Sequence, residues 1–299
     1  MPRSRAGRQD SGVPMTVVDS PIVAAARDSW DVSRGAALLP GLVAHARLGG
    51  GHRCESWLSW STRDLCFVTV KLPRPGQVAN PLARAAIARE EMALRSLRHP
   101  AVPRLLHADA GAPVPHLVTE YVEGPTLAAA LRDDGPFEPD DVVLLGIQLA
   151  IALHYLHTVP LLVHLDVKPG NVVLRDGRPV LLDFGTARPV GAPAPTGKAR
   201  GTPAYMGPEQ RRRRPAAPGM DVFALGVMLD EVLHGSRREP ACAPCDDTPL
   251  DATLAQLRHE DAPGRPPTAL AVARRLDRHV QLDDERPVPT YAWSTVRRR

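Results

Sequence analysis

An aspartate, a lysine and an asparagine lie close together in VHLDVKPGNVVL, residues 163–174. Asp166, Lys168 and Asn171 interrupt an otherwise apolar run, and a buried carboxylate is costly unless it is paired or coordinates a cation. Nine residues further on, Asp183 opens the tripeptide Asp-Phe-Gly. Asn171 and Asp183 offer oxygen ligands for Mg²⁺, while Asp166 is left to orient a hydroxyl. With Lys168 as a positive charge, this combination predicts phosphoryl transfer, whereas either motif alone also fits polar loop residues at strand ends.

Phosphoryl transfer requires a nucleotide, and two features of the first half could bind one. In RLGGGHRCESWLSW, Gly49 and Gly51 follow a predicted strand, where bare backbone can approach phosphates. On its own, this glycine cluster is more typical of a hairpin turn. Lys71, in VTVK, lies on a predicted strand among apolar neighbours, so its ammonium requires an anion. The α- and β-phosphates could supply that anion, as could Glu90 or Glu91 on the following helix.

These residues depend on a β-rich first half and a helix-rich second half. Strands are predicted in LVAHARLGGG, ESWLSW, LCFVTVKL and HLVTEYV, with one helix over residues 81–99. The second half predicts an apolar helix over residues 139–157, a second from Asp221 to Gly235 and a third capped by Thr268. Short strands are expected over 172–174 and 180–182, joined by a turn at Asp176-Gly177. Residues 186–218 and 236–267 are expected to be loop.

The motifs occur in an order that resembles the protein kinase family, specifically the bacterial eukaryotic-like (Hanks-type) serine/threonine kinases. They are LGGGHRCES, VTVK, REE before RHP, TEYVEG, HLDVKPGN, DFG, GTPAYMGPE, DVFALG and GRPP. The resemblance implies an α+β, two-lobed protein kinase-like fold with a small β-rich N-lobe containing one helix and a larger, mainly helical C-lobe. We assign residues 1–38 to a flexible N-terminal tail, 39–121 to the N-lobe, 122–281 to the C-lobe and 282–299 to a C-terminal tail.

The resemblance also implies a role for each matching residue. In the N-lobe, Lys71 would contact the α- and β-phosphates of ATP and pair with Glu90. Thr119 would be the gatekeeper, the hinge from Glu120 to Val122 would bind adenine, and the backbone at Gly49 and Gly51 would approach the phosphates. In the C-lobe, Asp166 would be the catalytic base, Lys168 would contact the transferring phosphate, and Asn171 and Asp183 would be Mg²⁺ ligands. Thr202 would bridge Asp166 and Lys168. Glu209 would form an ion pair with Arg265, and Asp221 would support the catalytic-loop backbone.

Two departures from the family pattern modify this expectation. Cys54 stands at the third glycine position of the glycine-rich loop, which predicts weaker nucleotide binding. Leu165 stands where most members have an arginine that pairs with a phosphate on the activation loop. Leucine cannot do so, and we expect activity without strict dependence on activation-loop phosphorylation. Thr186 and Thr196 remain candidate sites of autophosphorylation.

Two further features each allow a functional interpretation and an interpretation as surface loop residues without a specific function. The run Arg211 to Arg214 could dock acidic or phosphorylated substrate segments, or it could be a solvated basic loop. The Cys242 and Cys245 pair has C-x-x-C spacing, which occurs in redox and metal sites. Because no second cysteine pair accompanies it, we favour two incidental loop cysteines. The region between Gly235 and Arg265 is short and Pro-rich, where the family usually has another helix that docks substrates or partners, so that docking surface is not expected in its usual form.

The expected activity is transfer of the γ-phosphate of ATP to Ser or Thr hydroxyls of protein substrates, with ATP and Mg²⁺ as cofactors. The alternatives are a pseudokinase-type nucleotide-binding scaffold and a small-molecule phosphotransferase. The net charge of +4 comes largely from basic runs without interleaved aromatics, so nucleic acid is not expected as a partner. With no signal-peptide pattern and no predicted membrane span, we expect a cytoplasmic protein.

Overall fold

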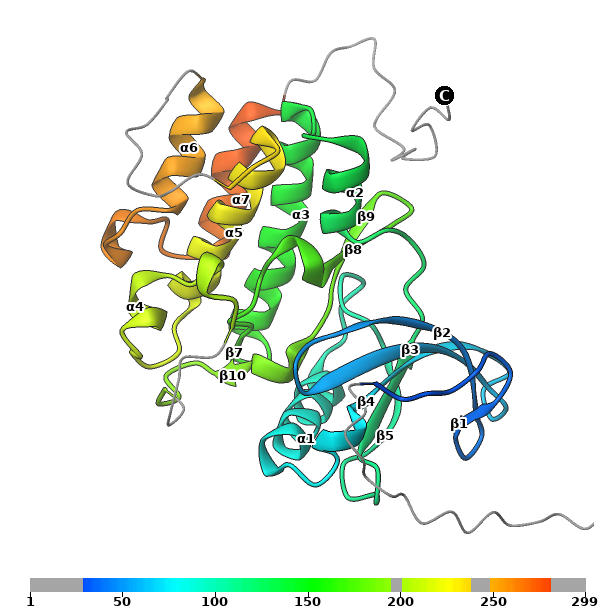
Figure 1. The fold of residues 1–299 in the computed structure, drawn as a ribbon. Helices are drawn as coiled ribbons and strands as arrows, with labels where there is room; N and C mark the ends of the chain where they lie inside the picture. Colours follow the sequence, from blue (N-terminus) through cyan, green and yellow to red (C-terminus); the bar gives the residue numbers. More distant parts are fainter. Residues whose placement is uncertain (1–28, 195–200, 238–247, 281–299) are drawn as a thin grey trace, which may run out of the picture.

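The computed structural model describes residues 29–194, 201–237 and 248–280. A twisted sheet with one long helix forms one half of the molecule, and a group of helices forms the other (Figure 1). The first half ends with β6 (His116–Glu120), and the second begins with α2 (Leu127–Asp134). The predicted α+β, two-lobed fold is therefore confirmed.

The N-lobe sheet is antiparallel throughout, with the order β1-β2-β3-β4-β6-β5. Its other strands are β1 (Ala37–Leu39), β2 (Leu42–Gly50), β3 (Cys54–Ser61), β4 (Cys66–Pro73) and β5 (Leu105–Asp109). In β4, Val68, Val70 and Leu72 are fully buried in one apolar cluster. Because side chains alternate along a strand, Lys71 points to the opposite face.

Helix α1 (Pro81–Ser96) packs against β4, β5 and β6 of this sheet. The side chain of Asn80 accepts a hydrogen bond from the Leu82 amide, and Pro81 occupies the first turn, so the helix begins where the sequence predicts. It ends at Ser96, three residues before the predicted end, because Leu97 is already extended. Glu90 lies in its buried stripe with Ile87.

The N-terminal tail predicted over residues 1–38 is too long, because residues 29–38 belong to the N-lobe. Ser29 Oγ and the Trp30 amide donate to the carboxylate of Glu55 at 2.7 and 3.0 Å. The Trp30 indole donates to the Pro73 carbonyl at 2.8 Å, and Leu38 is buried. A sequence without periodicity gives no sign of such contacts. Residues 1–28 and the predicted C-terminal tail, 282–299, lie outside the described residues.

The C-lobe is built around α3 (Pro139–Thr158), α5 (Pro218–His234) and α7 (Ala269–Leu276), which contact one another (Figure 1). Pro139 and two aspartates open α3, as predicted. The αL residue Gly235 ends α5, and the Thr268 hydroxyl caps α7. Among the described residues, only α3 has the length and composition of a membrane span, and 56% of that stretch is buried in the lobe, as in a core helix.

The prediction of mostly loop over residues 236–267 is wrong in its second part. Helix α6 (Pro249–Leu257) lies there, next to α5. The Thr248 hydroxyl accepts from the Asp251 amide at 3.1 Å and caps the helix. Leu250, Leu254 and Leu257 then form a buried stripe at helical spacing. Residues 238–247, which precede the helix, are outside the described residues.

Short strands, a short helix and turns make up the remaining elements of the two lobes. They are β7 (Leu162–Val163), β8 (Val172–Arg175), β9 (Arg178–Leu181), β10 (Arg188–Pro189) and α4 (Pro208–Arg211), with 3-10 turns η1 (Pro75–Gln77), η2 (Pro169–Asn171), η3 (Phe184–Thr186), η4 (Pro203–Tyr205), η5 (Ala262–Gly264) and η6 (Asp277–His279). β8 and β9 form the predicted hairpin, with positive φ at Asp176 and Gly177. β10, η4 and α4 lie where the sequence predicts only loop over 186–218.

Candidate active site

Lys71 lies at the centre of an ion-pair group that joins both lobes. Its Nζ is 2.6 Å from Glu90 Oε2 on α1 and 2.7 Å from Asp183 Oδ1, two residues beyond β9. The neighbouring Glu91 instead pairs with Arg95 on the helix surface at 2.6 Å. Of the two glutamates that sequence reasoning considered, the structure places Glu90 against Lys71.

The charges in this group determine its protonation. Burial raises the pKa of the Asp183 carboxyl, but the Lys71 ammonium outweighs burial and lowers that pKa to about 2. Burial lowers the pKa of Lys71, and the charges of Asp183 and Glu90 reverse the effect and raise it above its usual value. The group therefore holds a charged lysine and an ionised Asp183 across the physiological range.

The Asp-Phe-Gly segment has a strained but well-supported conformation. Asp183 has φ +62°, in the left-handed region that non-glycine residues rarely adopt. Phe184 is fully buried, its ring meets that of His164 edge to face at 4.9 Å, and its amide donates to Glu90 Oε1 at 3.3 Å. These contacts fix Asp183 with its carboxylate toward Lys71.

Asp166 accepts hydrogen bonds at both carboxylate oxygens and is 8% exposed. Its Oδ1 accepts from the amide and the hydroxyl of Thr202, both at 2.8 Å. Its Oδ2 accepts from Lys168 Nζ at 2.8 Å and from Asn171 Nδ2 at 3.1 Å. Lys168 Nζ also lies 2.6 Å from the Thr202 hydroxyl. The predicted bridge from Thr202 to Asp166 and Lys168 is therefore present, and it fixes the orientation of the Asp166 carboxylate.

Asp221 supports the backbone before Asp166, as the resemblance implies. Its fully buried carboxylate accepts from the amides of His164 and Leu165, each at 2.8 Å, and from His157 Nε2 at 2.9 Å. Burial raises the pKa of Asp221, and the hydrogen bond and charge of His157 outweigh it and lower the pKa. Leu165 has φ +68°, so Asp221 stabilises a strained turn that leads directly into Asp166.

Asn171 and Asp183 form an oxygen donor set next to Lys71. Asn171 directs its amide nitrogen to the carbonyl and carboxylate of Asp166, which leaves its amide oxygen available to a ligand. Lys71 and the Gly185 amide both bind Asp183 Oδ1, which leaves Oδ2. The Leu182 amide donates to the Asn171 carbonyl at 2.8 Å and keeps the two segments adjacent. An amide and a carboxylate oxygen are the donor types that Mg²⁺ prefers, so the residues fit that ion.

The glycine-rich loop connects β2 and β3 in a hairpin. A side chain at Gly50 would place its Cβ 2.7 Å from the Cys54 carbonyl oxygen, so only glycine fits there. Gly49, with φ +155°, and Gly51 have open space where a Cβ would be. Sequence reasoning selected Gly49 and Gly51 for phosphate contact and missed Gly50, although the run of three glycines was the signal. Cys54 is half-buried and packs against the main core.

The predicted adenine hinge lies at the junction of the lobes. The Glu120 carboxylate accepts from the Arg104 amide at 3.2 Å and from Arg175 of β8 at 3.3 Å, and so links the N-lobe to the C-lobe. Val122 is buried and packs with Val173 of β8, which sequence reasoning did not select. The sheet register places Thr119 two residues from the partner of Lys71, on the same face of the sheet as that lysine.

The segment after Thr202 is fixed to the C-lobe. Arg265 makes a two-pronged contact with Glu209, at 2.6 and 3.0 Å, as predicted. Gln210, which sequence reasoning missed, donates to the Leu165 carbonyl at 2.9 Å. Leu165 itself is buried, where it clusters with Val163, Ala216 and Met220.

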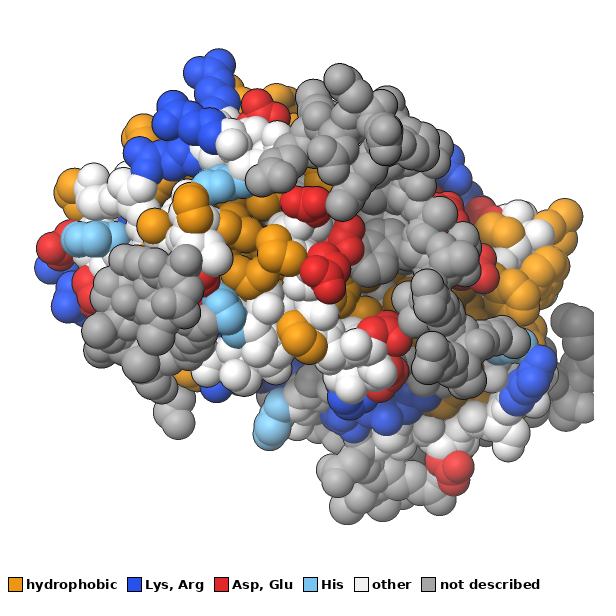
Figure 2. Space-filling view, turned by 90° about the horizontal axis from the view of Figure 1, so that it is seen from above, with side chains coloured by type: hydrophobic (Ala, Val, Ile, Leu, Met, Phe, Trp, Pro, Cys, Tyr) orange, Lys and Arg blue, Asp and Glu red, His pale blue; other side chains and the backbone are white. Residues whose placement is uncertain are grey.

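The surface carries both signs of charge. On the part of the face in Figure 2 that the structure describes, basic side chains lie mainly near the edge and acidic side chains nearer the middle. Arg211 to Arg214 are all exposed, and Arg211 donates to the Met206 carbonyl at 2.9 Å. Cys242, Cys245 and Thr196 lie outside the described residues.

Comparison with known proteins agrees with this geometry. The family model for the protein kinase domain matches residues 43–258. The chain is 35% identical over 186 residues to the probable serine/threonine-protein kinase PkwA of Thermomonospora curvata, covering 62% of this chain and 25% of that protein. It is 37% identical to the serine/threonine-protein kinase PkaA of Streptomyces coelicolor, over 49% of this chain and 28% of that protein. It is 30% identical to the serine/threonine-protein kinase PknB of Mycobacterium leprae, over 72% of this chain and 35% of that protein. The matches span about a quarter to a third of these relatives.

Proposed function

Because this chain belongs to the protein kinase family, we propose that it transfers the γ-phosphate of ATP to Ser or Thr hydroxyls of proteins. The observation that carries this proposal is the Asp166 carboxylate, which is held at both oxygens by Thr202, Lys168 and Asn171. A carboxylate in a fixed orientation can align a hydroxyl and take its proton as the new bond forms. The relatives are named as serine/threonine kinases, which supports the choice of acceptor.

The remaining residues bind and position the nucleotide. Lys71, held by Glu90, contacts the α- and β-phosphates, and Gly49 and Gly51 leave the backbone open above them. The backbone from Glu120 to Val122 binds adenine. Asn171 and Asp183 hold Mg²⁺, and this ion, when bound, offsets the charge of the phosphates. Lys168, next to Asp166, stabilises the charge that develops on the transferred group.

The proposal is tested with purified protein, labelled ATP, Mg²⁺ and a generic Ser/Thr protein substrate. Asp166→Asn keeps the shape of the side chain, and we expect it to lower kcat by about 100-fold or more because the general base is lost. Equal, low activity of both proteins would favour a pseudokinase. Transfer to aminoglycosides but not to proteins would favour a small-molecule phosphotransferase.

We further propose that this activity has no strict dependence on activation-loop phosphorylation. Leu165 supplies no charge for a phosphate and packs instead against Val163, Ala216 and Met220. The contacts from Lys71 to Glu90 and Asp183 form in the unmodified chain, which supports the proposal. Thr196→Ala should therefore retain most of the activity, and a loss of about 100-fold or more would contradict this.

We also propose that the protein is located in the cytoplasm, where ATP is supplied.

A further inference from the structure

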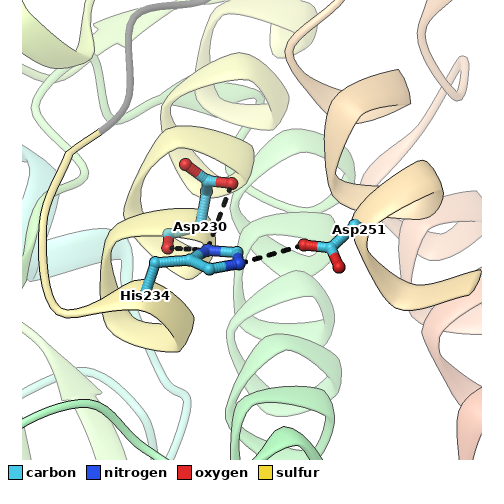
Figure 3. A group of neighbouring side chains, drawn as sticks. All are labelled: Asp230, His234 and Asp251. Carbon is cyan, nitrogen blue, oxygen red and sulfur yellow. Dashed lines mark hydrogen bonds and ion pairs between the residues drawn. The ribbon is translucent and has the colours of Figure 1, made fainter. Parts of the chain in front are cut away.

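A second group of ionisable side chains lies in the C-lobe, apart from the proposed active site. Figure 3 shows His234, in the last turn of α5, between the carboxylates of Asp230 and Asp251. Asp251 comes from the first turn of α6. Asp230 and Asp251 are buried, and His234 is 22% exposed in its side chain, so the group is reached from the surface. One ligand atom from each residue lies within 4.8 Å of the others.

The tautomer of His234 is set by its backbone neighbour. Its Nδ1 lies 2.9 Å from the carbonyl oxygen of Asp230, which can only accept a hydrogen bond. Nδ1 therefore carries a hydrogen, and in the neutral ring Nε2 carries a lone pair. Metal-binding histidines commonly donate their second ring nitrogen to a carbonyl in this way, which fixes the ring for coordination.

The Nε2 lone pair meets a second lone pair on Asp251. The two atoms, His234 Nε2 and Asp251 Oδ1, are 3.1 Å apart. Oδ1 is buried and accepts no hydrogen bond from any group that the structure describes. The other oxygen, Oδ2, is occupied by the Thr248 hydroxyl at 2.7 Å. With only 10% of the Asp251 side chain exposed, an anionic oxygen that accepts no hydrogen bond is costly unless a cation lies beside it.

We propose that His234 and Asp251 bind a divalent transition-metal ion, with Zn²⁺ as the ion that fits best, and that Asp230 supports the site without being a direct ligand. Zn²⁺ binds nitrogen and carboxylate oxygen at about 2.0–2.2 Å, so two ligands at a tetrahedral angle lie roughly 3.3–3.6 Å apart. The 3.1 Å between Nε2 and Oδ1 is slightly shorter than this range, so a shift of a few tenths of an ångström would bring the two atoms to the separation of zinc ligands. The nitrogen ligand disfavours Mg²⁺.

Asp230 supports His234 and is not placed to bind the ion directly. Arg258 Nη1 donates to its Oδ2 at 3.0 Å, and its Oδ1 lies 3.6 Å from His234 Nδ1, on the other side of the ring from Asp251. We therefore expect Asp230→Asn to weaken binding less than Asp251→Asn does. Its carboxylate, close to the ring of His234, still favours a cation at the site.

The ion would link α6 to α5 near the segment that follows Thr202. Glu231, adjacent to Asp230, accepts from the hydroxyl of Tyr205 at 2.6 Å, and Tyr205 lies three residues after Thr202. A metal that joins His234 to Asp251 therefore stabilises the C-terminal end of α5, which contacts both α6 and the segment after Thr202. This inference does not depend on the proposed kinase activity.

The test measures zinc binding by the full chain, after metal removal with a chelator, in millimolar Mg²⁺. Cys242→Ser and Cys245→Ser are introduced throughout, so that their thiolates do not bind zinc. We expect about one Zn²⁺ per chain and a Tm that rises by several degrees on loading. Asp251→Asn and His234→Ala should each weaken binding by about tenfold or more, whereas His154→Ala on α3, a histidine outside the group, should leave it unchanged.

Three results would overturn the proposal. The first is no zinc bound at micromolar concentrations in the presence of Mg²⁺. The second is equal affinity in Asp251→Asn, His234→Ala and the His154→Ala control. The third is a Tm that falls between pH 5.5 and 8 to the same extent with and without zinc, which would mean that a proton on His234, rather than a metal, joins it to Asp251.

Discussion

At the scale of single residues, Lys71 shows why identity alone does not define a role. A strand lysine normally points to solvent, but here α1 and the Asp-Phe-Gly segment place two carboxylates within 2.7 Å of its ammonium. Burial without those carboxylates would lower the pKa of Lys71 and favour its neutral form. Glu90 is therefore expected to act through Lys71, as a positioning residue.

Replacing Glu90 with Gln tests this. The substitution removes the negative charge that orients Lys71, so we expect kcat/KM for ATP to fall by about 10-fold or more. Glu91→Gln is the matched control, since Glu91 pairs with Arg95 at the surface and should change little. Similar losses in both variants would show that Glu90 has no particular role in positioning Lys71.

Cys54 gives a prediction on pH. Burial raises the pKa of its thiol to about 11, and the charges of Glu90 and Asp183 add to the rise, whereas Lys71 opposes it. Only the thiolate reacts with iodoacetamide, so alkylation at pH 8 should be about 100-fold slower than for an ordinary thiol. The rate should increase about tenfold per pH unit up to pH 10, as the thiolate fraction grows. Mass spectrometry of the Cys54 peptide, with the exposed Cys66 as reference, measures this, and equal rates at pH 8 would contradict it.

At the scale of elements, α6 and α4 show how short helices escape sequence reasoning. Both lie in Pro-rich stretches, where proline reads as a helix breaker. In each, the proline occupies the first turn, where its missing N–H costs nothing. The leucine stripe of α6 was present in the sequence, but nine residues give too few repeats to stand out from a loop.

The exposed arginines after α4 give an element-scale prediction. Arg212 and Arg214 lie between α4 and the start of α5. In the same stretch, the Ala216 amide donates to the Ala192 carbonyl and the Ala216 carbonyl accepts from the Gly191 amide, which links it to the segment that follows β10. If this basic run docks acidic substrates, replacing both arginines with Glu should raise KM for an acidic peptide by about tenfold and leave kcat unchanged. Arg274→Glu with Arg278→Glu, two exposed arginines at the other end of the lobe, is the control. An unchanged KM would mean that the run is only a solvated loop.

At the scale of the whole molecule, a few buried charges hold distant parts of the chain together. Arg265 and Glu209 are 56 residues apart, and the arginine is almost fully buried, with Phe223 under its guanidinium at 4.8 Å. Arg265 also donates to the carbonyls of Gly219, His259 and Glu260. The pair thereby connects α4, α5 and the segment before α7.

Breaking this pair should destabilise the C-lobe. Glu209→Gln leaves a buried guanidinium without its counter-ion, and we expect the free energy of unfolding to fall by about 3 kcal/mol in a urea titration. Asp133→Asn removes the partner of Arg132 in an exposed pair and should cost less than about 1 kcal/mol. A change at Glu209 as small as that control would show that the three carbonyls suffice for Arg265.

The sequence by itself determined the order of the motifs, the long elements and the residue types for phosphoryl transfer. These are local properties: α3 is apolar along its length, the β8–β9 turn needs positive φ, and Asp166, Lys168 and Asn171 are near neighbours in the chain. Family resemblance then supplied Glu209 as the partner of Arg265. It also chose Glu90 over Glu91 as the partner of Lys71, a choice that spacing alone left open.

Only the tertiary structure decided which contacts join segments far apart in the chain. Residues 29–30 bind Glu55 in the N-lobe, Gly50 is the glycine whose Cβ would collide with the backbone, and His234 faces Asp251 from another helix. No periodicity encodes such pairs, because each depends on how two elements pack, and a carboxylate has the same local sequence signal whether its partner is water, an arginine or a metal ion.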